Sequence, residues 1–308
     1  MTHVVRDLAA LDPGPSVVTI GNFDGVHRGH QVLLRRTVTL AADHDARAVA
    51  VTFDPHPTTV LRPQAAPPLL QPLAERVARL VEAGVDAVVV LPFTRELAAM
   101  SPAGFVAEVL AGPLAAVRVV VGTNFRFGAK AAGDVVTLLE LGETHGFTPE
   151  AVTLLELDGR RISSSAIREH LQAGEVDWAR AALGRPFQLP GEVIRGDGRG
   201  RSIGFPTANL ATPSGIVVPG AGVYAGHAEV DGSWLPAVTN VGVRPTFDGR
   251  TMTVEVHLLD ADVDLYGRQL TFRFEHRLRG EQRFDGPEAL VAQIARDVRA
   301  ARGRLAGA

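Results

Sequence analysis

The sequence predicts an α/β domain with a parallel sheet, followed by a mainly β domain. Valine-rich runs alternate with amphipathic stretches in the first part of the chain. From residue 187 onward, glycines and prolines separate short segments in which apolar and polar residues alternate. A length of 308 residues suits about two domains. We therefore expect one domain over residues 1–184 and another over residues 185–308.

The first domain has the spacing of repeated strand–helix–strand units. Its valine-dense runs are typical of strands buried on both faces of a parallel sheet, with helices covering those faces. Ligands of such sheets bind beyond the carboxyl ends of the strands. The expected strands are residues 16–20, 48–53, 86–91, 118–121 and 151–155. The expected helices are residues 31–42, 73–83, 102–110, 134–144, 165–173 and 177–183.

The second domain has the period-2 pattern of strands that bury one face. Val254, Val256 and Leu258 alternate with polar residues, and residues 270–274 repeat the pattern. Several short strands of this kind predict a small antiparallel barrel. A final helix is expected, with Asp285 as its cap, Glu288 three residues later and an apolar stripe at residues 290, 294 and 298.

The composition excludes several classes of function. The chain has no cysteine, so disulfides, thiolate zinc sites and cysteine nucleophiles are ruled out. A net charge of -3 gives no support for a nucleic-acid partner. The longest apolar runs fall far short of the ~18 residues that a membrane span needs. Residues 1–15 lack the apolar core of a secretory signal, so we expect a cytoplasmic protein without a membrane partner.

Residues 21–30 are the strongest candidate for a catalytic motif in the first domain. They follow the first expected strand and open the first helix, where free N–H groups and the helix dipole favour phosphate. His27 and His30 are three residues apart and so lie on one side of the helix. Gly29 allows close approach of a ligand to the backbone. The motif suits nucleotidyl transfer by direct attack; a zinc site would need a third ligand.

Three further segments follow expected strands at the same edge of the sheet: residues 53–57, 122–128 and 162–168. Asn124 can hydrogen-bond a ligand, whereas the phenylalanines around it suit a core equally well. One serine at a helix start is explained by capping. Three serines followed by Arg168 indicate a second phosphate site.

Two segments of the second domain suggest phosphate and metal binding. Residues 191–201 form a strand that runs into a basic loop with alternating glycines, whose N–H groups can wrap a phosphate, although a flexible hairpin has the same pattern. Thr207 and Asn209 alternate onto one strand face and offer the hard oxygen ligands that Mg²⁺ prefers. Glu255 is the candidate base that a kinase acting on a hydroxyl requires, although a solvent-facing position would explain it equally.

The motifs of both domains together resemble the bacterial bifunctional riboflavin kinase/FAD synthetases. The resemblance covers residues 17–183 for the FMN adenylyltransferase module and residues 187–302 for riboflavin kinase, where residues 204–209 match the family signature. It implies a six-stranded antiparallel barrel with a terminal helix, ATP, riboflavin and FMN as substrates, and Mg²⁺ bound by Thr207 and Asn209. Glu255 is then the group that activates the riboflavin 5′-hydroxyl.

The resemblance also implies a set of binding residues in each domain. Position 165 is often threonine in this family, and the serine here keeps the hydroxyl. In the adenylyltransferase the implied ATP-binding residues are Gly21, Phe23, Asp24, His27, Gly29, His30, Asn124, Ser164, Ser165 and Arg168. In the kinase the implied flavin- or ATP-binding residues are Gly196, Gly198, Gly200, Arg201, Thr207, Asn209, Asn240, Arg244, Arg279, Glu281 and Phe284.

Three alternatives remain open at this point. One domain can be degenerate, although both motif sets look complete. The chain can be a flavin or nucleotide sensor, but sensing requires no catalytic base such as Glu255. It can be a nucleotidyltransferase for another phosphate ester, but the attached kinase-like domain favours FMN.

Overall fold

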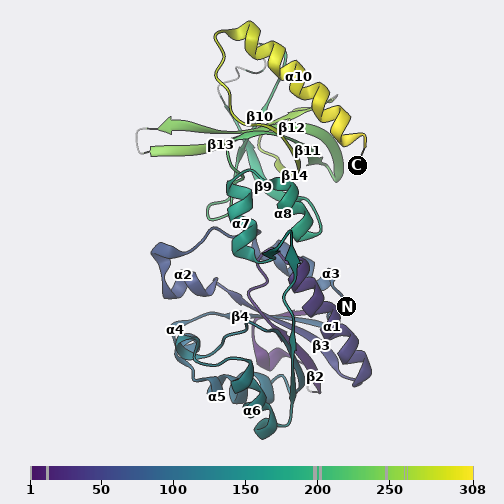
Figure 1. The fold of residues 1–308 in the computed structure, drawn as a ribbon, viewed down its shortest axis with the longest axis vertical. Coiled ribbons are helices and arrows are strands. Elements are labelled where there is room, and N and C mark those ends of the chain that lie inside the picture. The colour runs from purple at the N-terminus through teal and green to yellow at the C-terminus, as the bar shows by residue number, and fades with distance from the viewer. Residues whose placement is uncertain are drawn as a thin grey trace. The chain divides into compact units, whose positions relative to one another are not determined.

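The structure is a computed structural model that describes residues 2–11, 14–196, 200, 203–246, 249–259, 261 and 263–307. Contacts divide the chain into two compact units, Met1–Ser164 and Ser165–Ala308 (Figure 1). The contacts group two short helices, α7 (Ser164–Gln172) and α8 (Val176–Leu183), with the second unit. The domain boundary between residues 184 and 185 stays a prediction.

The first unit is built on a parallel sheet of six strands in the order β1-β4-β3-β2-β5-β6. The predicted α/β architecture is therefore confirmed. The strands are β1 (His3–Val5), β2 (Ser16–Ile20), β3 (Arg47–Asp54), β4 (Ala87–Pro92), β5 (Ala116–Gly122) and β6 (Thr148–Val152). A hairpin of β7 (Glu156–Leu157) and β8 (Arg160–Arg161) follows the sheet.

Two of these strands differ from the prediction for a physical reason. β6 begins at Thr148, three residues before the predicted strand, and it includes Pro149 and Glu150. It is an edge strand that pairs only with β5, where a polar sequence and a proline are tolerated. β1 is the opposite edge and has only three residues, too few to show a pattern.

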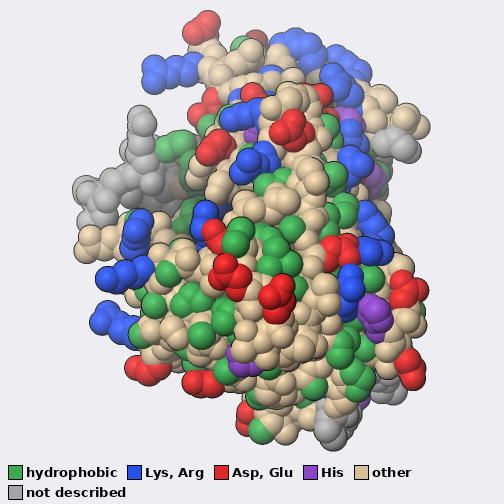
Figure 2. All heavy atoms as spheres, turned by 60° about the horizontal axis from the view of Figure 1, so that its bottom comes forward, with side chains coloured by type: hydrophobic (Ala, Val, Ile, Leu, Met, Phe, Trp, Pro, Cys, Tyr) green, Lys and Arg blue, Asp and Glu red, His purple; other side chains and the backbone are tan. Residues whose placement is uncertain are grey.

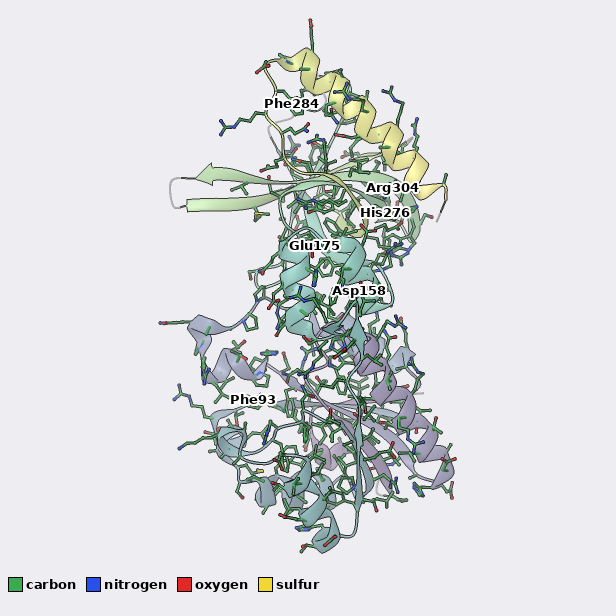
Figure 3. All side chains as sticks on the ribbon, viewed as in Figure 1. Phe93, Asp158, Glu175, His276, Phe284 and Arg304 are labelled. Atoms are coloured by element: carbon green, nitrogen blue, oxygen red, sulfur yellow. The ribbon has the colours of Figure 1, made fainter. Side chains whose placement is uncertain are left out.

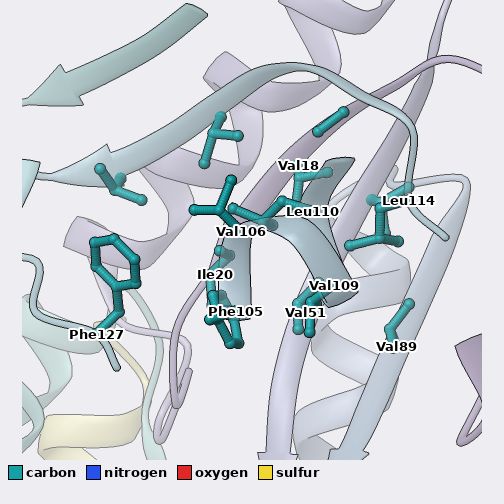
Figure 4. Packing of buried hydrophobic residues seen from close by; sticks show 14 of the residues in the cluster. Val18, Ile20, Val51, Val89, Phe105, Val106, Val109, Leu110, Leu114 and Phe127 are labelled. Carbon is teal, nitrogen blue, oxygen red and sulfur yellow. The ribbon is translucent and has the colours of Figure 1, made fainter. Parts of the chain in front are cut away.

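Helices cover both faces of the sheet, as its valine-rich strands require. On one face, Val18 and Val51 pack against Phe105 and Leu110 (Figure 4). On the other, buried residues such as Val17 pack with the helical side chains of α1 and α3. The helices are α1 (Arg28–Asp43), α2 (Pro57–Leu61), α3 (Leu73–Glu82), α4 (Arg95–Ala99), α5 (Pro102–Phe105), the π-helical turn η3 (Val106–Ala111) and α6 (Val135–His145). Short 3₁₀ turns are η1 (Leu8–Ala10), η2 (Pro63–Ala65) and η4 (Ala129–Ala131).

The second unit is a closed antiparallel barrel in the order β10-β13-β12-β11-β14-β9, which confirms the predicted barrel and its six strands. Val254 and Val256 are buried and Glu255 is not, as the alternation predicted. The strands are β9 (Phe187–Ile194), β10 (Ala208–Ala211), β11 (Gly222–Val230), β12 (Ser233–Thr246), β13 (Gly249–Leu258) and β14 (Gln269–Arg279). His276 on β14 contacts α8, with its Nδ1 2.9 Å from Asp177 Oδ1 (Figure 3).

The terminal helix α10 (Pro287–Leu305) covers the outside of the barrel. Its predicted cap is wrong: Gly286 is the N-cap, without a side-chain hydrogen bond, and Asp285 precedes the helix. Pro287 takes the first helical position, where its fixed φ and missing N–H suit a helix start. Val298 and Ala301 pack against the barrel.

On the face shown in Figure 2, acidic and basic side chains are interspersed.

A buried ion pair fastens α10 to the barrel. Arg279 at the end of β14 donates from Nε and Nη2 to both carboxylate oxygens of Asp297, at 2.8–3.1 Å. Gln293 donates to the same carboxylate at 2.8 Å. Asp297 is only 6% exposed. Removing one partner of such a pair leaves a buried charge that nothing compensates.

Asp297→Ala should therefore destabilise the second unit by about 3 kcal/mol. Both tryptophans, Trp178 and Trp234, lie in this unit, so urea unfolding followed by tryptophan fluorescence reports on it. Arg299→Ala, at an exposed position on the same helix, is the matched control and should change little. A similar small change for both variants would contradict this account of α10.

Candidate active sites

The loop between β2 and α1 is held in place by contacts of its own buried residues. Phe23 is fully buried with φ of 49°, which is uncommon for a non-glycine residue. Asp24 is 2% exposed, and its carboxylate accepts a hydrogen bond from the Leu70 N–H at 2.9 Å. Its carbonyl accepts one from the Ser164 hydroxyl at 2.8 Å. Phe23, Asp24 and Ser164 thus shape this loop, and direct contact with ATP stays a prediction for each.

The two histidines lie together at the start of α1, as predicted. His27 is the N-cap, and its Nδ1 accepts from the His30 backbone N–H at 3.3 Å. The rings stack with centroids 3.6 Å apart. Because Nδ1 of His27 is an acceptor, the ring proton of the neutral form lies on Nε2. The pair therefore presents a defined hydrogen-bond donor at a helix N-terminus.

His30 is kept uncharged by its surroundings. Its Nδ1 is enclosed and has no hydrogen-bond partner among the described residues. Burial lowers the pKa of His30 well below 6.5, and the nearby His27 lowers it further. The ring edge also contacts Phe23, at 5.1 Å between centroids. At neutral pH His30 is thus a neutral imidazole in an apolar setting.

Gly29 leaves little room for a side chain beside His27. A Cβ at this position would lie 3.1 Å from both Cε1 and Nδ1 of the His27 ring. A side chain would therefore require the capping ring of His27 to shift by a few tenths of an ångström. At Gly21 the same test gives only ordinary contact, 3.4 Å to the Phe23 ring.

Asn124 and the segment after β5 are placed at the same end of the sheet. Asn124 is exposed, and its Oδ1 would lie 3.0 Å from a Cβ on Gly122. Phe125 and Phe127 stack on each other at 5.4 Å and join the core, so the phenylalanines of this motif are structural. Asn124 is therefore an exposed polar residue of this segment that can contact a ligand, beside the exposed Thr123 and Arg126.

Basic residues lie on both sides of the serine-rich segment. Ser165 and Arg168 lie on α7 in the second unit, where Arg168 Nη2 donates to the Ser165 hydroxyl at 3.3 Å. The β7–β8 hairpin ends in an exposed arginine, Arg161, that the sequence reasoning missed. The next residue, Ile162, has its carbonyl 3.9 Å from a Cβ on Gly29. A basic pair directly before the serines was the available signal.

Arg76 on α3 had no predicted role, although Glu75 and Arg76 follow the order of the family's segments. It is 1% exposed and donates from Nη1 to the carbonyls of Asn22 and Phe53, each at 3.0 Å. Burial lowers its pKa, and the fields of Asp24 and Asp54 oppose this effect. Its place on the apolar face of an otherwise amphipathic helix was the signal in the sequence.

In the second unit, strand pairing gathers the predicted kinase residues. Asn209 on β10 lies directly opposite Glu255 on β13, which lies directly opposite Asn240 on β12. Directly paired residues of antiparallel strands point to the same face. The row faces away from the barrel interior, because the neighbours Val254 and Val256 are buried.

The described part of the glycine-rich loop packs on the predicted metal ligands. A Cβ on Gly196 would lie 2.2 Å from Asn209 Nδ2. A Cβ on Gly200 would lie 2.3 Å from the Phe205 carbonyl and 3.2 Å from the Thr207 hydroxyl. Only glycine fits at position 200, where a Cβ would clash with backbone. At position 196 a side chain would displace the amide of Asn209. Gly198, Arg201 and the side chain of Arg244 lie outside the described residues.

The remaining kinase residues divide into two groups. Glu281 belongs with the row, since its Oε1 would lie 3.1 Å from a Cβ on Gly242, beside Asn240. Arg279 is bonded to Asp297 and lies 5.7 Å from the ring of Phe284, on the segment leading to α10 (Figure 3). The structure thus gives Arg279 a role in holding α10, and flavin contact stays a prediction for both Arg279 and Phe284.

The sequence reasoning missed a histidine and a recess next to this row. His257, on the same face as Glu255, has its Nδ1 2.8 Å from the Pro206 carbonyl and therefore donates to it. A recess with about 60 Å³ of free space opens beside Thr207. Apolar barrel residues such as Val256, the polar Thr207 and Asp264, and the ring of Tyr266 line it. Arg195 lies 5.5 Å from that ring.

The state of His30 makes the stability of the first unit depend on pH. The pKa of His30 in the folded chain lies below 6.5, its value in the unfolded chain. Between these two pKa values the unfolded chain binds more protons than the folded one. The free energy of unfolding should therefore fall as pH drops below 6.5 and should not change through this residue at higher pH. Circular dichroism melting from pH 8 to pH 5 measures the effect. His30→Gln should flatten the curve and His44→Gln, an exposed control at the end of α1, should not; identical curves would contradict the assignment.

Comparison with known proteins finds a family match for each of the two units. A family model for FAD synthetase matches residues 10–166, and one for riboflavin kinase matches residues 183–305. A bifunctional riboflavin kinase/FMN adenylyltransferase from Pseudomonas fluorescens is 44% identical over 99% of this chain and 98% of its own length. The Escherichia coli K12 protein of that name is 40% identical over 97% and 96% of the two chains.

The fold comparison covers the whole chain. The crystal structure of a macrolide-efflux protein from Streptococcus pneumoniae matches with a TM-score of 0.89 at 29% identity, over 98% of each chain. In the part of this chain that the structure describes, no helix is both long and apolar enough to cross a membrane. On the family models and the full-length relatives, this chain belongs to the bifunctional riboflavin kinase/FMN adenylyltransferase family.

Proposed function

We propose that the barrel unit phosphorylates riboflavin to FMN with ATP, and that the sheet unit adenylates FMN to FAD with a second ATP and releases pyrophosphate. The observation that carries this proposal is the row of Asn209, Glu255 and Asn240 in the same chain as the histidine pair of α1. Family membership supports both activities in one chain. We place both steps in the cytoplasm, with no nucleic-acid or membrane partner, and assign the domains to residues 1–184 and 185–308.

In the kinase step, Glu255 accepts the proton of the riboflavin 5′-hydroxyl as the oxygen attacks the γ-phosphate of ATP, whose bond to the β-phosphate oxygen breaks, and ADP leaves. Thr207 and Asn209 would hold Mg²⁺, because their hydroxyl and amide oxygens are hard ligands and the glycine-rich backbone lies close to both side chains. Bound there, Mg²⁺ supplies charge neutralisation at the transferred phosphate. His257 positions the Thr207 loop through the Pro206 carbonyl.

The recess beside Thr207 suits the base of ATP. Phosphates held at Thr207 leave the nucleoside within reach of this recess, which Tyr266 and apolar barrel residues line together with Asp264. A flat aromatic base stacks on tyrosine and gains from leaving water. The arginine over Tyr266 adds positive charge near the phosphates.

In the adenylyl step, the FMN phosphate attacks the α-phosphate of ATP in line and pyrophosphate leaves. His27 donates from Nε2, and the free N–H groups of α1 add donors and the positive end of its dipole. A neutral His30 avoids repulsion within the pair in the free enzyme. We assign Asn124, Ser165, Arg168 and Arg161 to the triphosphate as well.

Glu255→Gln should reduce FMN formation by roughly 10²- to 10⁴-fold, because the amide cannot accept the hydroxyl proton. FMN adenylation by the same preparation should stay within about twofold, since the residue lies in the other unit. Separate assays with riboflavin and with FMN, followed by chromatography, measure both. Loss of both activities would contradict independent sites.

His27→Asn combined with His30→Asn should show the reverse pattern. Adenylation should fall by roughly 10²- to 10³-fold, the usual effect of losing donors to developing charge. FMN formation should be unchanged, and circular dichroism melting checks that the first unit of the variant is folded. If the protein is a sensor, the unmodified chain should bind flavin and form neither product. If the sheet unit acts on another phosphate ester, the unmodified chain should not convert FMN to FAD.

A further inference from the structure

The buried guanidinium of Arg76 is not used by the mechanism above. It belongs to the largest fully buried side chains of the chain, and its Nη1 lies within 3.2 Å of three oxygen atoms. Two are the carbonyls of Asn22 and Phe53, and the third is the hydroxyl of Thr52. Among the described residues, none of its hydrogen bonds is to a carboxylate.

An arginine in such a place is costly unless it is hydrogen-bonded, and an apolar residue would fill the space at lower cost. The carbonyl contacts therefore indicate what the side chain does. The last backbone bond between β2 and β3 runs from the Gly21 N–H to the Val51 carbonyl, at 3.1 Å. Asn22 and Phe53 lie just beyond it, where the two strands separate.

Arg76 continues the pairing of β2 and β3 past that last backbone bond. Its Nη1 joins the carbonyl of Asn22 to that of Phe53, and the Thr52 hydroxyl donates to the same Asn22 carbonyl at 3.0 Å. The side chain of Asn22 reaches further, with Nδ2 3.3 Å from Nε2 of His56. Both segments that leave the strands, toward His27 and toward His56, are thus held at one point.

We infer that Arg76 is a positioning residue for adenylyl transfer, which fixes the loop ending at His27 relative to the segment after β3. This inference rests on the proposed adenylyltransferase function of the first unit. Displacing a reacting group by about 1 Å is enough to cost 10²-fold in rate. Lysine keeps the charge but is one bond shorter, so its amine falls short of the carbonyls.

The test compares Arg76→Met, Arg76→Lys and Thr52→Val with the unmodified chain. Arg76→Met should lower kcat for FMN adenylation by roughly 10- to 100-fold, with a smaller change in KM for ATP. Arg76→Lys should recover only part of the loss. Thr52→Val keeps the shape, loses one hydrogen bond and should cost roughly three- to tenfold. The matched control is Arg79→Met on the same helix, where Arg79 bonds Glu82 instead, and it should stay within about twofold.

Riboflavin phosphorylation in the same preparations, together with circular dichroism melting, separates positioning from folding. The inference requires native melting of Arg76→Lys and Thr52→Val, unchanged FMN formation and reduced adenylation. If Arg76→Met does not fold, Arg76→Lys and Thr52→Val test the inference instead. For Arg76→Ala, methylguanidinium should restore adenylation several-fold, whereas equal urea should not.

Two results overturn the inference. One is adenylation within twofold of normal in well-folded Arg76 and Thr52 variants. The other is a loss that tracks the unfolded fraction and disappears at lower temperature. If the unmodified chain makes no FAD from FMN, the proposed function is wrong and this inference is wrong with it. If the unmodified chain makes FAD normally and the variants do so at the same rate, this inference alone is wrong.

Discussion

Backbone pairing between strands sets the position of both sites. In the barrel, the register that places Asn209 opposite Glu255 and Glu255 opposite Asn240 carries three polar side chains to one face. A shift of one residue in any of these strands would turn its polar residue into the core. In the sheet, parallel pairing brings the carboxyl ends of β2, β3 and β5 to one edge, where the histidine loop and Asn124 begin.

Buried polar groups then fix what the strands leave open. Asp24 bonds the Leu70 N–H, and the Asn22 carbonyl receives Arg76 and Thr52, so the histidine loop is fixed at two successive points. In the second unit, the Arg279–Asp297 pair fastens α10 over the barrel. Each of these contacts would leave a buried charge or dipole unsatisfied if one partner were lost, so they specify one arrangement of the loops.

The sequence predicted the architecture and the main motifs because those depend on local pattern. Valine density indicates a doubly covered strand, and the alternation around Glu255 shows which residues face the core. The edge strand β6 was misplaced because its polar sequence lacks the usual apolar pattern of a buried strand. The start of α10 was misplaced because Asp285 looked like a cap, whereas Gly286 is the N-cap and Pro287 begins the helix. The ends of elements depend on neighbours that the local sequence does not show.

The roles of buried polar residues were harder to predict, because they depend on contacts between distant segments. Nothing near Arg279 in sequence reveals that Asp297, on the next helix, takes its guanidinium. The sequence places Arg76 on the apolar face of its helix, but only the structure shows its carbonyl partners on two distant segments. The glycines at 196 and 200 suggested phosphate binding, and the structure adds that they make room for Asn209 and Thr207.

The most direct test of the account is a chromatographic time course of the purified chain with riboflavin, ATP and Mg²⁺. The account predicts that FMN appears first and is then converted to FAD. FMN that accumulates without FAD would contradict the assignment of the sheet unit. Riboflavin that stays bound and unchanged would contradict both assignments and favour a sensor.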